Sequence, residues 1–211
     1  MGLKTNNYIY NLSYNYRNYD GYRPHSQEFM HQVNSVFRGY IGKRGTIFIS
    51  GNYVNGINKQ AGSLTMDQYL ADPYQPLGLA ETYDYKRITQ KGRIAVSYKR
   101  LFGKGESNEI ELTGYGGVKE LVKTDQLYYT LLTRYNVGSY LRYTNRSKIF
   151  KKDNEFTVGM DYAYQAGPQA QFNNYFGQKD LYIISDDENN IGNIVLYFQN
   201  QYNLVKNKLS V

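Results

Sequence analysis

The stretch E-F-T-V-G-M-D-Y-A-Y-Q, Glu155–Gln165, decides the fold class of this chain. Every second residue from Phe156 to Tyr164 is aromatic, β-branched or a thioether, and the residues between them are polar or small. A period of two is that of an extended strand with one apolar and one polar face. Soluble sandwiches contain such strands too, so the fold class depends on how often the pattern recurs and how long each copy is.

The alternation recurs along the whole chain. It is cleanest in the first copy, where four tyrosines and Leu12 alternate with more polar residues. We predict eight strands, followed by a ninth that has barely begun at Leu209–Val211. Several are longer than the five or six residues typical of soluble sheets. The predicted strands are Asn7–Arg17, Glu28–Ile41, Thr46–Asn55, Asp84–Phe102, Glu109–Glu120, Gln126–Tyr143, Glu155–Gln165 and Ile191–Leu204.

The connections between these strands tend to alternate in length. Links of residues 18–27, 56–83 and 166–190 are long, and the second contains a possible short helix at Met66–Leu70. The turns at Gly42–Gly45, Gly103–Asn108 and Val205–Asn207 are short, and a basic turn is expected at Thr144–Asn154. Long loops on one side and short turns on the other are typical of an up-and-down transmembrane barrel. The polar faces carry charged residues that a wet lumen would accept and a dry core would not.

The sequence therefore predicts an all-β, antiparallel up-and-down meander that is part of a transmembrane β-barrel. The composition favours the same class, because 25 of the 211 residues are Tyr, which suits a membrane interface. There is no apolar run long enough for a transmembrane helix, and the absence of Cys excludes disulfides and thiolate metal sites. The net charge of +7 comes from dispersed Lys and Arg, which indicates solvated loops rather than a nucleic-acid partner.

No residue pattern indicates catalysis, a metal site or a cofactor. His25 and His31 are the only histidines, and neither has the Ser or carboxylate spacing of a relay. The acidic cluster Asp186–Glu188 lacks the Gly-punctuated spacing of a calcium loop. Gly114–Gly117 is followed by no Lys-Ser/Thr, so we expect a bend or close backbone approach within a strand instead of a phosphate loop. The chain is predicted not to be an enzyme.

Four motifs, in order and spacing, resemble the barrel portion of TonB-dependent outer-membrane receptors, particularly ferric-siderophore receptors. The resemblance covers nearly the whole chain. It implies a place in the outer membrane of a Gram-negative bacterium, contact with lipid, a plug domain, a TonB complex acting through that plug, and an iron-siderophore or similar ligand. The motifs are D-G-Y-R-P-H-S at Asp20–Ser26, G-S-L-T-M-D-Q-Y-L-A-D-P at Gly62–Pro73, L-T-G-Y-G-G at Leu112–Gly117 and L-Y-F-Q-N-Q-Y-N-L at Leu196–Leu204.

The chain departs from that family in two ways. The family has an N-terminal plug and a TonB box, and its barrel has about 22 strands. Residues 1–211 show neither plug nor box and only eight predicted strands, so we expect an internal barrel segment of a larger receptor, without the plug domain and the C-terminal strands. Two alternatives remain: a complete small eight-stranded outer-membrane barrel with a structural or adhesive role, and a soluble β-sandwich binding module.

If the parent protein is a siderophore receptor, an anionic or aromatic ligand lands on the extracellular loops. Arg23 supplies a fixed positive charge and planar donors, and Tyr22 supplies a stacking face and a hydroxyl. Bracing the loop against a plug or a neighbouring loop is the competing interpretation for both. The candidate ligand-binding residues are Tyr22, Arg23, His25, Tyr74, Phe172, Tyr175 and Phe176.

Overall fold

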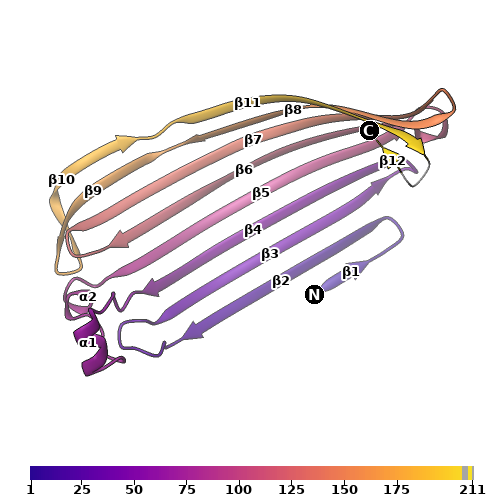
Figure 1. The fold of residues 1–211 in the computed structure, drawn as a ribbon. Coiled ribbons are helices and arrows are strands. Elements are labelled where there is room, and N and C mark those ends of the chain that lie inside the picture. Colours follow the sequence, from indigo (N-terminus) through magenta and orange to yellow (C-terminus); the bar gives the residue numbers. More distant parts are fainter. Residues whose placement is uncertain (206–208, 211) are drawn as a thin grey trace.

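A computed structural model of the protein describes residues 1–205 and 209–210. They form one antiparallel sheet in which the long strands lie side by side in chain order, with two short helices at one end (Figure 1). The order across the sheet is β1-β2-β3-β4-β5-β6-β7-β8-β11-β12. The strands are β1 (Gly2–Lys4), β2 (Tyr8–Tyr19), β3 (Glu28–Ile41), β4 (Gly45–Lys59), β5 (Lys86–Phe102), β6 (Asn108–Thr124), β7 (Tyr128–Ile149), β8 (Lys152–Ala166), β9 (Pro168–Tyr175), β10 (Gln178–Glu188), β11 (Ile191–Val205) and β12 (Leu209–Ser210).

The all-β meander and its eight long strands are confirmed, but the predicted basic turn at Thr144–Asn154 is wrong. Strand β7 continues to Ile149 and β8 begins at Lys152, so only Phe150 and Lys151, both with positive φ, make the turn. The charged residues that suggested a turn are part of the ladder instead. Arg146 on β7, for example, forms an ion pair with its directly opposite residue Glu155 on β8.

The predicted long link of residues 166–190 is also largely strand. Strand β7 pairs with β8 from Tyr135 onward and with β9 at Tyr128–Leu132, so β8 and β9 follow one line along β7. Strand β10 returns beside β9 after a turn at Phe176 and Gly177, and the acidic residues Asp186–Glu188 lie in this strand. Because this stretch lacks a clean alternation of apolar and polar residues, its strand character was not visible in the sequence.

The link between β4 and β5 contains the expected helix. Helix α1 spans Met66–Ala71, and Thr65 and Gln68 form a capping box at its start. A second helix, α2 (Gly78–Thr82), and a 3-10 turn, η1 (Lys104–Glu106), were not predicted. No helix in the described part of the chain is long and apolar enough to span a membrane. At the other end, β12 pairs with β11. Residues 206–207 of the predicted turn, residue 208, and Val211 of the predicted ninth strand lie outside the described residues.

The strand register joins the apolar faces of the strands into one surface. Met160 on β8 lies opposite Leu141 on β7 and Leu196 on β11, and Leu141 in turn lies opposite Leu112 on β6. These four side chains are exposed. We call the surface that they share with their cross-strand neighbours the apolar face, and the opposite surface the polar face. An exposed apolar surface of this extent is unusual on a water-soluble monomer and marks a contact with lipid or another partner.

The sheet has no second layer within residues 1–205 and 209–210. The buried hydrophobic residues there are Ala61, Ala80 and Phe172, all near one end of the sheet, so no dry core of the β-sandwich type is present. The sheet is also open in the described part of the chain, since neither β1 nor β2 pairs with β11 or β12. Residues 1–205 and 209–210 therefore form neither a two-layer sandwich nor a closed barrel.

Charges on the polar face are matched near the short turns. The buried carboxylate of Glu109 lies 2.8 Å from the Lys99 amine and 3.0 Å from Nη1 of Arg146. Next to it, Glu111 accepts from the guanidinium of Arg142 and, at 2.7 Å, from the hydroxyl of Tyr140. The network satisfies carboxylates that would be costly to bury unpaired.

Two glycines allow aromatic rings to lie flat on the polar face. A Cβ atom at Gly138 would lie 2.3 Å from the ring of Tyr115, and a Cβ atom at Gly159 would lie 2.3 Å from the ring of Tyr197. Close approach is also found at Gly117, where a Cβ atom would lie 2.6 Å from a backbone oxygen, as expected for the Gly114–Gly117 run. At Gly114 nothing lies within 4 Å, so that glycine is not required for space.

Candidate ligand-binding site

All seven candidate ligand-binding residues lie at one end of the sheet. The β2–β3 link, the β4–β5 link with both helices, the β6–β7 turn and the β9–β10 turn meet there (Figure 1). We call this the loop end and the opposite end, which carries the short turns after β3, β5 and β7, the turn end. The links after β2 and β4 are long, but the connections after β6 and β9 are tight.

The side chain of Arg23 forms hydrogen bonds within the loops of this end. Its Nε donates to the carbonyl of Gln75 at 2.9 Å, Nη1 to the carbonyl of Gly62 at 3.0 Å and Nη2 to the carbonyl of Ala61 at 3.3 Å. A planar guanidinium is suited to collecting several carbonyls in this way. The contacts fasten the β2–β3 link to the β4–β5 link, which is the bracing role that competed with ligand binding for this residue.

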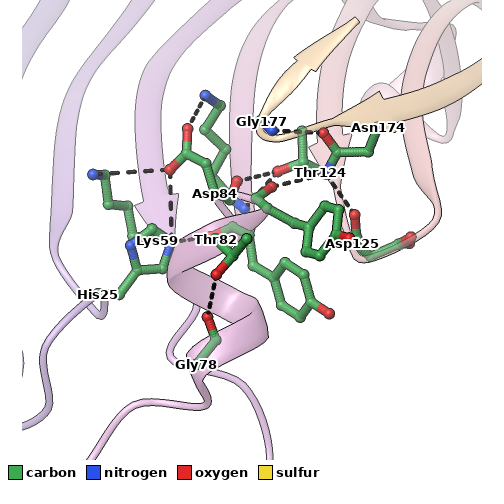
Figure 2. A network of polar contacts seen from close by, with 12 residues as sticks. His25, Lys59, Gly78, Thr82, Asp84, Thr124, Asp125, Asn174 and Gly177 are labelled. Atoms are coloured by element: carbon green, nitrogen blue, oxygen red, sulfur yellow. Dashed lines mark hydrogen bonds and ion pairs between the residues drawn. The ribbon is translucent and has the colours of Figure 1, made fainter. Parts of the chain in front are cut away.

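His25 also joins the two links. Its backbone is left-handed, with φ of 58°, and its side chain is 9% exposed. The Nε2 atom lies 3.0 Å from the carbonyl oxygen of Tyr85 and 3.6 Å from a carboxylate oxygen of Asp84 (Figure 2). Asp84 itself forms ion pairs with Lys59 and Lys86. His25 is thus enclosed by this cluster and presents little surface to a ligand.

Thr124 and Asn174 connect several segments of the loop end (Figure 2), and no pattern in the sequence indicated this role. The fully buried Thr124 donates its hydroxyl to the Asp84 carbonyl and accepts from the backbone N–H of Lys86 at 2.9 Å. The side-chain amide of Asn174 donates to the carbonyl of Tyr83 at 2.8 Å and to that of Asp125 at 2.6 Å. Its oxygen accepts from the N–H of Gly177 at 2.8 Å.

Two ionisable groups in this network are perturbed. Burial alone would raise the pKa of Asp125, but hydrogen bonds from the backbone N–H groups of Tyr128 and Leu127 and from the Lys123 amine lower it below its ordinary value. Burial, and then the nearby charge of Asp125, raise the pKa of Tyr85. Asp125 therefore stays ionised in its turn, where it holds the start of β7.

The predicted aromatic residues divide into packed and exposed ones. Phe172 is 6% exposed, and the Lys179 amine lies 4.6 Å from the centre of its ring, so it is a packing residue. Tyr175 and Phe176 are exposed at the β9–β10 turn. The ring of Phe176 stacks on that of Tyr83 at 5.6 Å with an interplanar angle of 9°.

Tyr22 and Tyr74 are brought together in a hollow of about 600 Å³. Both side chains are exposed, and Tyr69 of α1, which the sequence did not single out, lines the same hollow. Arg23 forms part of its wall, together with Leu64, Thr65, Met66 and Pro73. Aromatic faces, phenol hydroxyls and a thioether offer stacking and hydrogen bonding to a partly apolar ligand.

The bracing role of Arg23 makes a testable prediction. Arg23→Ala removes the side-chain donor to the carbonyls of Gln75 and Gly62, and one of the two donors to the Ala61 carbonyl, which also accepts from the N–H of Leu77. We therefore expect a loss of about 2 kcal/mol in local stability and faster amide hydrogen exchange over residues 60–85. Arg23→Lys keeps the charge but not the fork of donors, and should loosen the link nearly as much. If Arg23→Lys instead behaves as wild type while Arg23→Ala weakens ligand binding, charge rather than bracing is the role of this residue.

Among the comparisons with known proteins, only solved structures show a similarity. No protein-family model and no curated protein sequence matches the chain. Among solved structures, the ferric citrate transporter FecA in its unliganded form is similar with a TM-score of 0.77 and 15% identity, over 97% of this chain and 38% of that chain. The RagAB peptide transporter is similar with a TM-score of 0.61 and 10% identity, over 95% of this chain and 29% of that chain.

The chain therefore shares its antiparallel all-β fold with part of each of these two structures and spans well under half of their length. Both of these structures are transporters by name.

Proposed function

We propose that this chain is a segment of the barrel wall of a TonB-dependent outer-membrane receptor that takes up an iron-siderophore or a similar nutrient. One observation carries the proposal: the register aligns a continuous apolar face opposite a charged, polar face on a long-stranded meander. A barrel in lipid needs its apolar face outside and tolerates charge only inside. The likeness in fold to FecA supports this orientation.

The remainder of such a receptor has clear points of attachment. Beyond their short pairings with β1 and β12, the outer edges of β2 and β11 present backbone groups that further barrel strands would pair. In this proposal a plug domain occupies the space in front of the polar face, and the TonB complex acts through that plug. The apolar face contacts the lipid of the outer membrane of a Gram-negative bacterium.

The ligand is assigned to the loop end. The hollow between Tyr22, Tyr69 and Tyr74 is the best-formed aromatic surface there, because Arg23, His25 and Phe172 are occupied by internal contacts. Tyr175 and Phe176 offer a second exposed aromatic surface at the β9–β10 turn. Stacking on tyrosine favours a chelator with planar or aromatic groups.

Uptake by the complete gene product tests this proposal. The protein is expressed in the outer membrane of a host that lacks its own siderophore receptors, and uptake of radiolabelled iron is measured with catecholate, hydroxamate and carboxylate chelators. We expect one class to be taken up, and uptake to stop when TonB is deleted. Location in the outer membrane without TonB-dependent uptake would indicate a structural or adhesive barrel, and a water-soluble protein would indicate a binding module.

The same assay tests the ligand surface. Tyr22→Ala and Tyr74→Ala should each raise the ligand concentration needed for half-maximal uptake, by on the order of tenfold for a lost stacking contact. Tyr19→Ala is the matched control, because Tyr19 is also exposed, at the end of β2, but does not line the hollow. Equal effects of all three variants would remove this hollow as the ligand site.

A further inference from the structure

One arginine lies on the apolar face, at the margin of this face near the turn end. Arg100 on β5 is directly opposite Gly45 on β4 and Ile110 on β6. Two residues earlier on β5, Tyr98 is opposite Leu112 of the apolar face, so Arg100 projects from the same side of the sheet. A charged side chain on the lipid side of a barrel is tolerated only near the interfaces with water. If the apolar face contacts lipid, Arg100 therefore lies at the level of the lipid headgroups.

The side chains near Arg100 are those of a membrane interface. Phe102, two residues further along β5, is exposed, and the centre of its ring lies 6.4 Å from that of Tyr143 on β7. The hydroxyl of Tyr143 donates to the side-chain oxygen of Asn108 at 2.7 Å, so this residue combines an apolar ring with a hydrogen-bonded polar end. Aromatic residues of this kind mark both interfaces of a transmembrane barrel.

Two adjacent turns place further basic residues beside Arg100. The β3–β4 turn carries Lys43 and Arg44, and the β5–β6 turn carries Lys104. A backbone N–H of β5 donates to the carbonyl of Arg44 at 2.9 Å, which holds the first turn against this strand. Arg44 is paired with Glu106 at 3.2 Å. Within the described part of the chain no ion pair includes Lys43, Arg100 or Lys104.

Lysines elsewhere on the apolar face have partners within the chain. Lys59 on β4 and Lys86 on β5 lie directly opposite each other at the loop end, and both form ion pairs with Asp84. Lys152 on β8 donates to the carbonyl of Leu204 at 2.5 Å. The charge at Arg100 thus differs from these in facing outward without an acidic residue or carbonyl to meet it.

We propose that Arg100, together with Lys43 and Lys104, binds the phosphate group of an anionic phospholipid at the periplasmic surface of the outer membrane. The short turns of a barrel lie on the periplasmic side. The guanidinium offers planar donors to phosphate oxygens, the two lysines add positive charge, and the acyl chains lie against the neighbouring apolar side chains. The inference rests on the proposed function in taking the apolar face as lipid-facing. It goes beyond general lipid contact because it assigns selectivity for anionic lipid to one place on the wall.

The test uses the complete gene product, folded in detergent, and native mass spectrometry with phosphatidylglycerol and the zwitterionic phosphatidylethanolamine. We expect the protein to retain phosphatidylglycerol at lower lipid concentrations. Arg100→Gln should weaken that retention by about fivefold, and Lys43→Gln/Arg100→Gln/Lys104→Gln by at least about twentyfold, because each basic residue near a membrane surface adds to the attraction of anionic lipid. Arg100→Lys keeps a positive charge and should retain most of the affinity.

Arg38→Gln is the matched control. It removes one positive charge from the polar face, where the Arg38 guanidinium lies 5.9 Å from the centre of the Phe48 ring. Equal loss of phosphatidylglycerol in Arg38→Gln and Arg100→Gln would overturn the proposal in favour of a general charge effect. Equal retention of the two lipids by the wild type would overturn it as well. Displacement of the bound lipid by excess glycerol 3-phosphate would overturn the lipid assignment in favour of a site for soluble phosphate.

The lipid site and the transport role can fail separately. Selective retention of phosphatidylglycerol without TonB-dependent uptake would support the lipid site and reject the proposed transport. TonB-dependent uptake by a protein that retains both lipids equally would reject the lipid site alone.

Discussion

Met160→Arg is expected to prevent stable insertion into the outer membrane, whereas Asp161→Arg, one residue further along β8, is expected to be tolerated. Met160 lies near the middle of β8 on the apolar face, between Leu141 and Leu196 of the neighbouring strands. An arginine on the lipid side at the midplane of a barrel costs about 2–4 kcal/mol. Asp161 is on the polar face, opposite Tyr140 and Val195, and in a pore an arginine on this face is turned away from lipid.

Because both variants introduce an arginine, a difference between Met160→Arg and Asp161→Arg reports the face of the sheet on which the arginine lies. Asp161→Arg changes the net charge by more than Met160→Arg does, so a simple charge effect would make it the worse of the two. The measurement is the amount of folded, heat-modifiable protein in the outer-membrane fraction and its urea midpoint in lipid. Similar loss for both variants, or for neither, would contradict the assignment of the apolar face to lipid.

The two faces were predictable from the sequence because successive side chains of a strand point to opposite faces, so that apolar and polar residues alternate along it. Phe156 to Tyr164 already defines the apolar face of β8, and the register then adds equivalent residues from neighbouring strands. The strand ends were less predictable. Arg146 and its charged neighbours in Thr144–Asn154 have the composition of a turn, and the cross-strand ion pair between Arg146 and Glu155 reveals that Arg146 belongs to a strand.

The loop end was predictable in location but not in the roles of its residues. The motif Asp20–Ser26 suggested Arg23 and His25 as ligand-binding residues. Both side chains instead form hydrogen bonds to backbone carbonyls of the β4–β5 link, more than thirty residues away in the chain. The exposed Tyr22 and Tyr74 share a hollow because those braces bring the two links together. Hydrogen bonds between residues so far apart in the chain do not affect the local alternation of apolar and polar residues. The sequence can therefore suggest Arg23 or Tyr22 as a functional residue without showing whether it joins two loops or contacts a ligand.

Asn174→Ala is expected to cause a large loss of stability at the loop end. Asn174→Ala removes the donors to the carbonyls of Tyr83 and Asp125 and the acceptor for the N–H of Gly177. Asn174 is 7% exposed, so water does not readily replace these bonds. Leaving buried polar groups unpaired costs about 1–3 kcal/mol each, so we expect about 3 kcal/mol of local stability to be lost.

Asn173→Ala is the matched control, because Asn173 is the exposed neighbour and its amide reaches only Asp180, at 3.3 Å. Amide hydrogen exchange at residues 83–86, at Asp125 and at Gly177 separates the two variants. Asn174→Ala should accelerate exchange in all three segments together, since one side chain joins them, whereas Asn173→Ala should affect only the β9–β10 hairpin. Acceleration confined to that hairpin in both variants would show that the β4–β5 link is held by Arg23, His25 and Thr124 without Asn174. If Asn174→Ala does loosen the β4–β5 link, the hollow that contains Tyr22 and Tyr74 loses the hydrogen bonds that hold one of its walls. Ligand affinity should then fall, although no residue that contacts the ligand has been changed.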